Sequence, residues 1–350
     1  MGRLKRLDGI RGLLAVYVML GHALPLTIAP AWAQSLASHG EAAVDLFFAL
    51  SGLVIAFSLQ RFGGFFRPFI VARARRLLPV YFLVLAASIA LGTLGDPLQY
   101  IPWAGTPARD IVFAALPRPL WVHILAHVTL LHGVIPQPVL PYAYVTLLGP
   151  AWSLSTEWQF YLLIGLVAPR QLGRFALVML GLGVAWWLLP YGPLFSRAFL
   201  PDAAPYFALG LASAAWLNGK RRALLPCLIG AWALGMAASP AKSFTPLIWG
   251  AVLLAQTQNW GALLQAPVLR YLGAISYPLY LLNEPVQRGL ALALGPALWG
   301  HPVLFSILFL ANSIVISVAL AALLHHTVEL PFMSRSKKLL LPVIAPPLRQ

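Results

Sequence analysis

The sequence is short of charged side chains and has almost no cysteine. Asp, Glu, Lys and Arg make up 9% of its 350 residues, whereas about 25% is usual for a soluble domain. So few charges cannot cover a surface that faces water, which excludes a soluble globular protein. The lone cysteine, Cys227, excludes an intramolecular disulfide and a cysteine-based metal cluster, and no metal site is expected.

Apolar residues, by contrast, make up 60% of the chain and gather in long runs. Because roughly 20 apolar residues suffice to cross a bilayer as a helix, we predict an all-α polytopic membrane bundle of about ten transmembrane helices. The expected spans are 10–29, 42–60, 77–95, 147–168, 174–190, 203–217, 223–239, 244–258, 272–291 and 303–325. One transmembrane domain over 1–335 and a cytoplasmic tail over 336–350 account for the chain.

A shorter apolar segment, 121–135, contains His123, His127 and His132. Basic residues are more frequent in cytoplasmic loops, so the number on each side indicates whether this segment crosses the membrane. If it does not cross, 19 basic residues lie inside and 5 outside, whereas crossing gives 12 and 12. We therefore predict a re-entrant or interfacial segment and cytoplasmic N and C termini.

The net charge of +15 comes from basic residues in short loops beside the apolar runs, as the positive-inside rule predicts. We therefore expect no nucleic-acid partner. The expected location is a bacterial-type inner (plasma) membrane, in contact with lipids. The sequence does not indicate an oligomeric state.

Only nine residues are acidic, so each can be weighed. Asp45 lies just inside the outer edge of the second span, and Glu157 lies near the midplane of the fourth. An ionisable group inside a membrane is costly and is often functional, although a polar tie between helices is the alternative. Glu41 is expected at the outer edge of the second span. The other six, Glu284 and Glu329 among them, are expected in loops or at span edges.

The first span carries Arg11 and His22, which are eleven residues apart. That spacing is about three helical turns, so both face the same way, roughly 16 Å apart along the axis. Two roles are open to His22. It either forms a structural hydrogen bond or acts as a general base near neutral pH. As a general base, it would share a polar cavity with Asp45 and Glu157.

The loop 61–76 holds five arginines, of which Arg73 and Arg76 are one helical turn apart. Positive-inside topology alone explains such a cluster. The sharper explanation is a phosphate site, because guanidinium groups bind phosphate through paired hydrogen bonds. With its phosphates bound there, coenzyme A would extend its flexible arm and thioester toward His22.

Several segments resemble, in order, motifs of the membrane acyltransferase-3 family. They are RLDGIRGLLAVYVMLGH (6–22), VDLFFALSGLVI (44–55), FRPFIVARARRLLPVYFL (66–83), HVTLLHG (127–133) with AWSLSTEWQFYLL (151–163), LGAISYPLYLLNEPV (272–286) and VELPF (328–332). The similarity covers the chain nearly end to end. Chance does not explain six matches in the right order.

The resemblance implies roles for particular residues. The family's Arg-X10-His motif falls on Arg11 and His22, its Arg-X-X-Arg motif on Arg73 and Arg76, and its Trp-Ser-Leu-Ser-X-Glu motif on residues 152–157. The expected catalytic residues are His22, Glu157 and Asp45. The expected donor-binding residues are Arg11, Arg67, Arg73, Arg76 and Ser153.

The resemblance also implies an O-acyltransferase reaction. The donor would be cytoplasmic acyl-CoA, expected to be acetyl-CoA, used as a co-substrate and not as a permanently bound cofactor. The acceptor would be a hydroxyl of a surface polysaccharide sugar or a glycosylated metabolite. Direct attack by the acceptor is expected, because no serine or cysteine has a clear nucleophile setting.

This chain departs from the family pattern at two positions on the outer side. Glu41 stands where a small residue is expected, and Asn283 stands where relatives often have His. The chain also ends after its last span, so we expect no appended hydrolase-like domain. The departures at Glu41 and Asn283 bear on the acceptor more than on the donor.

The competing interpretation is a transporter or flippase for a lipid-linked or small polar solute, in which membrane His, Asp and Glu relay protons. Transporters often contain internal repeats, and the two halves of this sequence show no convincing similarity. A structural scaffold gives no reason to bury His22, Asp45 and Glu157.

Cysteine labelling tests the predicted topology. A cysteine introduced after Lys338 should react with a membrane-impermeant maleimide only once cells are opened, because the charge distribution favours a cytoplasmic C terminus. Labelling of that site in intact cells would contradict the arrangement with an even number of spans.

Overall fold

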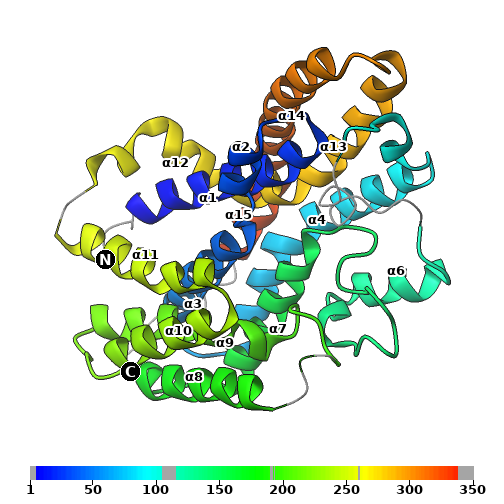
Figure 1. Cartoon of the computed structure of the whole chain (residues 1–350). Helices are drawn as coiled ribbons and strands as arrows, with labels where there is room; N and C mark the ends of the chain where they lie inside the picture. The colour runs from blue at the N-terminus through cyan, green and yellow to red at the C-terminus, as the bar shows by residue number, and fades with distance from the viewer. Residues whose placement is uncertain (1–4, 105–115, 190–191, 193, 259–260, 338–350) are drawn as a thin grey trace.

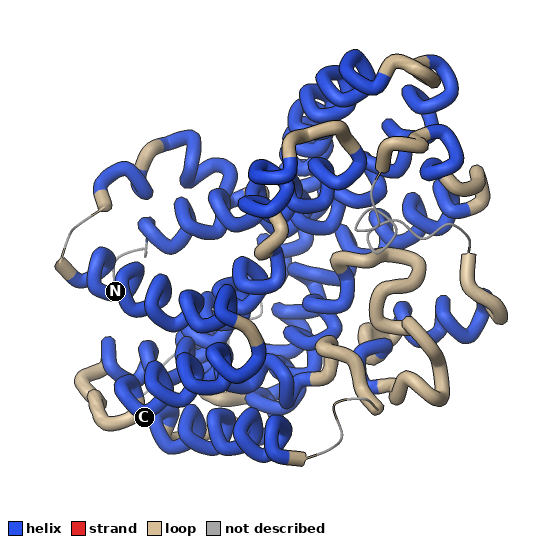
Figure 2. The backbone as a smooth tube through the Cα atoms, viewed as in Figure 1, coloured by secondary structure: helices blue, strands red, loops and turns tan. Residues whose placement is uncertain are grey.

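The computed structural model describes residues 5–104, 116–189, 192, 194–258 and 261–337. Every regular element within those ranges is helical (Figures 1 and 2). This confirms the all-α prediction for the described part of the chain. Of the expected tail over 336–350, Ser336 and Lys337 still belong to the last helix, and the rest lies outside the described residues.

The α-helices are α1 (Lys5–Ala23), α2 (Ala31–Ala37), α3 (Gly40–Arg61), α4 (Phe66–Gly92), α6 (Leu120–Val128), α7 (Ala151–Val167), α8 (Leu172–Leu188), α9 (Leu200–Leu217), α10 (Leu224–Ala238), α11 (Pro240–Thr257), α12 (Pro267–Ala274), α13 (Ser276–Ala297), α14 (Pro302–Leu324) and α15 (Leu330–Lys337). The short 3₁₀ helices are η1 (Leu24–Leu26), η2 (Pro97–Tyr100), η3 (His132–Val134) and η4 (Ala262–Gln265), and η5 (His325–Glu329) is π-helical.

Four of the described helical stretches are long and apolar enough to cross a membrane. They are Arg6–Leu26, Ala31–Arg61, Phe66–Gly92 and Pro302–Ser334, and α8 and α10 are apolar but shorter. The number of about ten spans therefore stays a prediction. Helix α6 has nine residues, or about 14 Å, which is too short to cross a hydrocarbon core of about 30 Å.

Two expected spans have different boundaries in the structure. Helix α4 begins at Phe66 and runs through Pro79, so Arg73 and Arg76 lie on a helix and not in a loop. Arginine is a good helix former, and the basic stretch simply continues into the apolar one. The span expected over 272–291 is instead two helices, α12 and α13, separated at Ile275.

Helices α3 and α9 cross at very close range. A Cβ atom on Gly52 would lie 2.5 Å from the carbonyl oxygen of Phe207, and one on Gly210 would lie 2.5 Å from the backbone nitrogen of Leu53. Small residues at such crossings let two membrane helices touch through their backbones. The buried helix α9 therefore fixes the position of α3, and α8 and α10 cover α9 on its other sides (Figure 1).

The interior that holds the candidate site is lined by residues of α1, α3, α4, α7 and α13. Helix α1 packs against α3, α12 and α13, while α4 packs against α7 and α13. An irregular stretch of chain from α6 to α7 closes one side (Figure 2). Side chains from segments far apart in the sequence therefore point into one space.

The α3–α9 crossing can be tested with a matched pair of glycines. Gly210→Ala should lower the free energy of unfolding by about 1–3 kcal/mol, because the added methyl group meets backbone atoms that cannot move aside. Gly181→Ala is the control, because a Cβ there meets nothing within 4 Å. Thermal unfolding in detergent measures both. Equal melting temperatures would contradict the close crossing.

Candidate active site

Three adjoining cavities run through the interior. The arginine cavity, about 60 Å³, is lined by Arg11, Ser51, Arg73, Arg76, Glu157 and Tyr161 among others. The middle cavity, about 70 Å³, is lined by Arg11, Phe47, Ser153, Glu157, Tyr277 and Tyr280 among others. The histidine cavity, about 610 Å³, is lined by His22, Gln34, Trp152, Arg197, Tyr280 and Glu284 among others.

Shared walls join the three cavities in a row. Arg11 and Glu157 line both the arginine and the middle cavity, and Val44 and Tyr280 line both the middle and the histidine cavity. The arginine cavity and His22 thus lie at opposite ends of a row of neighbouring cavities.

The arginine cavity carries an excess of positive charge. Helix α1 contributes Arg11 and α4 contributes Arg73 and Arg76, whereas Glu157 on α7 is the only acidic residue among the described residues that line it. The Tyr161 hydroxyl donates a hydrogen bond to Glu157 Oε2 at 3.0 Å. Three guanidinium groups facing one carboxylate make this cavity suited to an anion.

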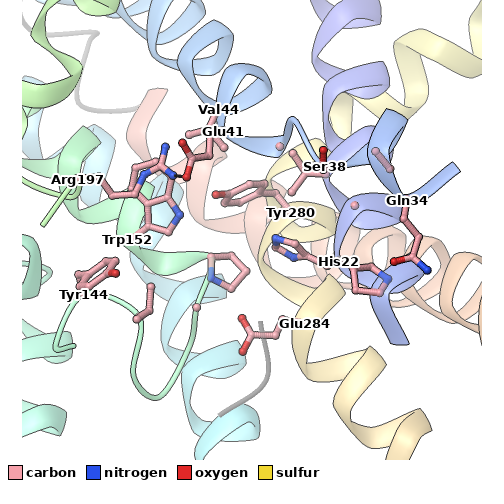
Figure 3. Close-up of a pocket in the computed structure, with 18 of the residues that line it drawn as sticks. His22, Gln34, Ser38, Glu41, Val44, Tyr144, Trp152, Arg197, Tyr280 and Glu284 are labelled. Atoms are coloured by element: carbon pink, nitrogen blue, oxygen red, sulfur yellow. Dashed lines mark ion pairs between the residues drawn. The ribbon is translucent and has the colours of Figure 1, made fainter. Parts of the chain in front are cut away.

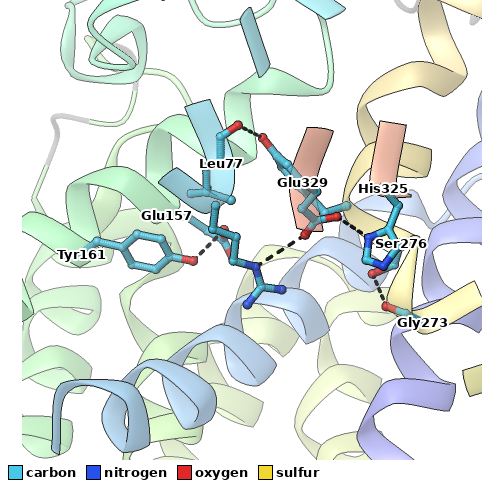
Figure 4. Close-up of polar contacts among 9 residues, drawn as sticks. Leu77, Glu157, Tyr161, Gly273, Ser276, His325 and Glu329 are labelled. Atoms are coloured by element: carbon cyan, nitrogen blue, oxygen red, sulfur yellow. Dashed lines mark hydrogen bonds and ion pairs between the residues drawn. The ribbon is translucent and has the colours of Figure 1, made fainter. Parts of the chain in front are cut away.

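Arg76 forms an ion pair with Glu329 in the C-terminal part of the chain, and Figure 4 shows Glu329 beside His325. Its Nε atom lies 3.8 Å from Glu329 Oε1, and Glu329 Oε2 lies 2.7 Å from His325 Nδ1. The Tyr277 hydroxyl donates to the carbonyl of Leu77 at 2.6 Å, which ties α13 to the same turn of α4. Glu329 is only 2% exposed and lies in a helical stretch, Pro302–Ser334, so it is not in a loop.

Arg11 and Arg73 lack a comparable partner. Neither forms an ion pair within 4.0 Å of a carboxylate in the described part of the chain, and Arg73 Nε is buried without a hydrogen-bond partner. Both are half-buried, and Glu157, the carboxylate that lines this cavity, offsets only part of the positive charge. These two side chains are therefore the ones best placed to gain from a bound anion.

His22 reaches the histidine cavity from the last turn of α1 (Figure 3). Its Nδ1 atom lies 2.7 Å from Asn283 Oδ1, and Asn283 Nδ2 donates to the carbonyl of Tyr280 at 2.5 Å. Glu284 also faces the cavity, with its carboxylate packed against Gly149. Like Glu329, Glu284 was expected in a loop or at a span edge, but it lies buried inside α13.

The opposite wall of this cavity is aromatic and charged. The Arg197 guanidinium lies 4.2 Å from the centre of the Trp152 ring and forms an ion pair with Glu41. Lys242 Nζ lies 3.8 Å from the second oxygen of Glu41. The departure from the family pattern at Glu41 therefore supplies the acidic partner of two basic residues at the rim.

The structure brings most of the expected site residues to the row of cavities, but not all. His22 lines the largest cavity, whereas Glu157 lines the two small ones, and no hydrogen bond joins the two in the described chain. Asp45 is buried against Tyr206 and lines none of the three cavities. Arg67 is exposed in the first turn of α4 and also lines none.

The three histidines of the α6 region stabilise a cavity wall. His123 Nδ1 lies 2.8 Å from Thr146 Oγ1, His127 Nε2 lies 3.0 Å from the carbonyl of Ala143, and His132 Nε2 lies 3.2 Å from that of Ala151. All three are buried. Their hydrogen bonds fix the position of the irregular stretch before α7, and part of that stretch lines the histidine cavity.

Sequence reasoning singled out Asn283 only as a departure from the family pattern that bears on the acceptor, and it missed Arg197 as a site residue. Asn283 belongs to a polar stripe on α13 with Glu284, Gln287 and Arg288. Polar residues inside an apolar run were a usable signal, because this stripe fell within the expected span 272–291. Arg197 lies in a loop, where the sequence offers no comparable signal.

The helical bundle thus places a basic cavity suited to an anion in the same row as a half-buried histidine. The sequence matches the acyltransferase domain family (acyltransferase-3) over residues 4–326. The chain therefore belongs to this family and is a membrane acyltransferase. Membership of an acyltransferase family argues against the transporter interpretation.

The chain is also similar to a curated protein of Rhizobium radiobacter described as "Protein 2 in picA locus". The two are 34% identical over 159 residues, which cover 43% of this chain and 75% of the relative. No solved structure matches the chain.

Proposed function

We propose that this acyltransferase moves an acyl group, expected to be acetyl, from cytoplasmic acyl-CoA to a hydroxyl of a carbohydrate or glycosylated acceptor. His22 acts as the general base. The proposal includes a bacterial-type inner membrane and cytoplasmic termini. The acyl-CoA is consumed in each turnover and is not a resident cofactor.

The observation that carries this proposal is the row of three cavities of unequal size. The arginine and middle cavities, about 60 and 70 Å³, suit a narrow flexible chain such as the arm of coenzyme A. The histidine cavity, about 610 Å³, falls within the range of small-molecule sites. A bulky acceptor and a slender donor arm would therefore meet at His22 from opposite ends.

The negatively charged phosphates of the donor would bind the guanidinium groups whose positive charge Glu157 offsets only in part. Arg11 and Arg73 would bind them directly, and Arg76 would do so while held by Glu329. Between the two ends, the hydroxyls of Ser153 and Tyr280, which lie 2.9 Å apart, line the middle cavity. They can hydrogen-bond with amide groups of the arm.

The proposed reaction is a direct transfer. His22 Nε2 takes the proton of the acceptor hydroxyl, whose oxygen attacks the thioester carbonyl carbon. The carbon–oxygen bond of the new ester forms and the carbon–sulfur bond breaks. The proton held by the imidazolium then passes to the departing coenzyme A sulfur, so that free thiol and neutral His22 are regenerated. The proposal assigns no step to Asp45.

The donor site is tested on α4. Arg73→Ala and Arg76→Ala should each weaken acetyl-CoA binding by tenfold or more, because charge-assisted contacts contribute about 1.5–3 kcal/mol. Arg73→Lys should restore only part of the affinity, because an ammonium group cannot make the forked contact. Calorimetry in nanodiscs measures the affinity.

Arg67→Ala is the matched control, because Arg67 lies on the same helix but is exposed and lines no cavity. Its affinity for acetyl-CoA should equal that of the wild type. If the Arg73→Ala and Arg76→Ala variants bound acetyl-CoA as tightly as this control, the two arginines would contribute to membrane topology and not to donor binding.

The chemistry is tested at His22. His22→Gln should bind acetyl-CoA normally but release coenzyme A thiol roughly 10²–10⁴ times more slowly, the loss expected for a missing general base. Mass spectrometry of surface glycans and secreted metabolites should show the same missing acyl groups in cells carrying this variant as in cells without the protein. Near-normal thiol release by His22→Gln would refute the assignment of the base.

A further inference from the structure

We propose that Asn283 is a positioning residue that holds His22 in the one neutral tautomer able to act as the base. This inference rests on the proposed role of His22 and deepens it. The contact joins the last turn of α1 to the middle of α13, two helices that meet along the interior.

The direction of each hydrogen bond follows from what its atoms can do. The carbonyl of Tyr280 can only accept, so the Asn283 group that lies 2.5 Å from it is the donating NH₂. The Asn283 oxygen must then face His22, at 2.7 Å from Nδ1. Because that oxygen can only accept, Nδ1 carries the proton. In a neutral ring, Nε2 is then left with its lone pair.

The free nitrogen is where the reaction needs it. His22 lines the histidine cavity (Figure 3), and Nε2 forms no hydrogen bond in the described part of the chain. With the opposite tautomer, a proton on Nε2 would block removal of a proton from the acceptor. Orienting the ring thus falls to an uncharged amide and not to Asp45 or Glu157, the carboxylates expected to be catalytic.

An amide partner differs from a carboxylate in one measurable way. It fixes the tautomer without stabilising the imidazolium by charge, whereas a carboxylate beside Nδ1 favours the protonated ring. The other ionisable or charged groups that line the cavity are Glu41, Tyr144, Arg197, Tyr280 and Glu284. Among the described residues, the contact of Nδ1 with Asn283 is the hydrogen bond that the His22 ring forms.

Asn283 is itself rigidly held. It is fully buried, and one helical turn further along α13 Gln287 Nε2 donates to the carbonyl of Met19 on α1 at 2.9 Å. The hydrogen bonds of Asn283 and Gln287 thus both join α13 to α1, but only that of Asn283 involves His22. Gln287 therefore provides a matched structural control.

The experiment follows coenzyme A thiol release from acetyl-CoA by the purified full-length protein in nanodiscs, across acid to alkaline pH. Asn283→Leu should keep acetyl-CoA affinity and lose roughly 10- to 100-fold in kcat, the range found for residues that orient metal-bound histidines. Asn283→Asp should recover most of the rate, because it again accepts from Nδ1. The acid limb of its pH–rate profile should lie at higher pH than that of the wild type.

Gln287→Leu should lower the melting temperature about as much as Asn283→Leu while keeping the wild-type rate and pH profile. If Asn283→Leu were as active as Gln287→Leu, or if Asn283→Asp left the acid limb unmoved, the positioning role would be refuted. Failure of the proposed function looks different. Either the wild type would release no thiol from acetyl-CoA, or His22→Gln would release it at the normal rate.

Discussion

The rigid length of α1 is the constraint on which the site depends. Arg11 and His22 lie on this one helix, about three turns or roughly 16 Å apart. A membrane helix satisfies its backbone hydrogen bonds internally, so that separation changes little. Helix α4 then adds Arg73 and Arg76 at one end, and α13 adds Asn283 at the other. The basic cavity and the histidine are thereby held at a fixed distance.

Burying charge inside a membrane protein is costly, and most charges here have a partner. Glu329 lies between His325 and Arg76, and Glu41 lies between Arg197 and Lys242. Glu157 accepts a hydrogen bond from Tyr161. Arg11 and Arg73, by contrast, form no ion pair in the described chain, so the positive charge of the arginine cavity is offset only in part by Glu157. A bound anionic ligand can neutralise this remaining positive charge.

What the sequence predicted well depends on local helix geometry. The spacing of Arg11 and His22, and that of Arg73 and Arg76, needs only the helical repeat, and the structure brings all four to the row of cavities. The start of α4 was missed because hydropathy marks the apolar part of a helix and not the helix itself.

Contacts between helices were beyond the reach of such reasoning. Asn283 is 261 positions from His22, and their meeting depends on how α13 is rotated about its axis. Asp45 shows the converse, because its depth in the membrane suggested a shared cavity, yet it faces Tyr206 on α9. That orientation depends on the backbone approach at Gly52 and Gly210, which an apolar pattern does not encode.

The small volumes of the arginine and middle cavities also suggest why the donor as a whole need not cross the membrane. Carrying the phosphates of coenzyme A through the bilayer would desolvate several charges, which is costly in a membrane interior. In the proposed reaction, the phosphates would stay at Arg11 and Arg73, and only the uncharged arm and its thioester would extend through the narrow middle cavity. The acyl group alone would then reach the acceptor, and the free thiol would withdraw by the same route. A transporter must open a path for its whole solute, whereas the proposed enzyme would need a path only as wide as the donor's arm.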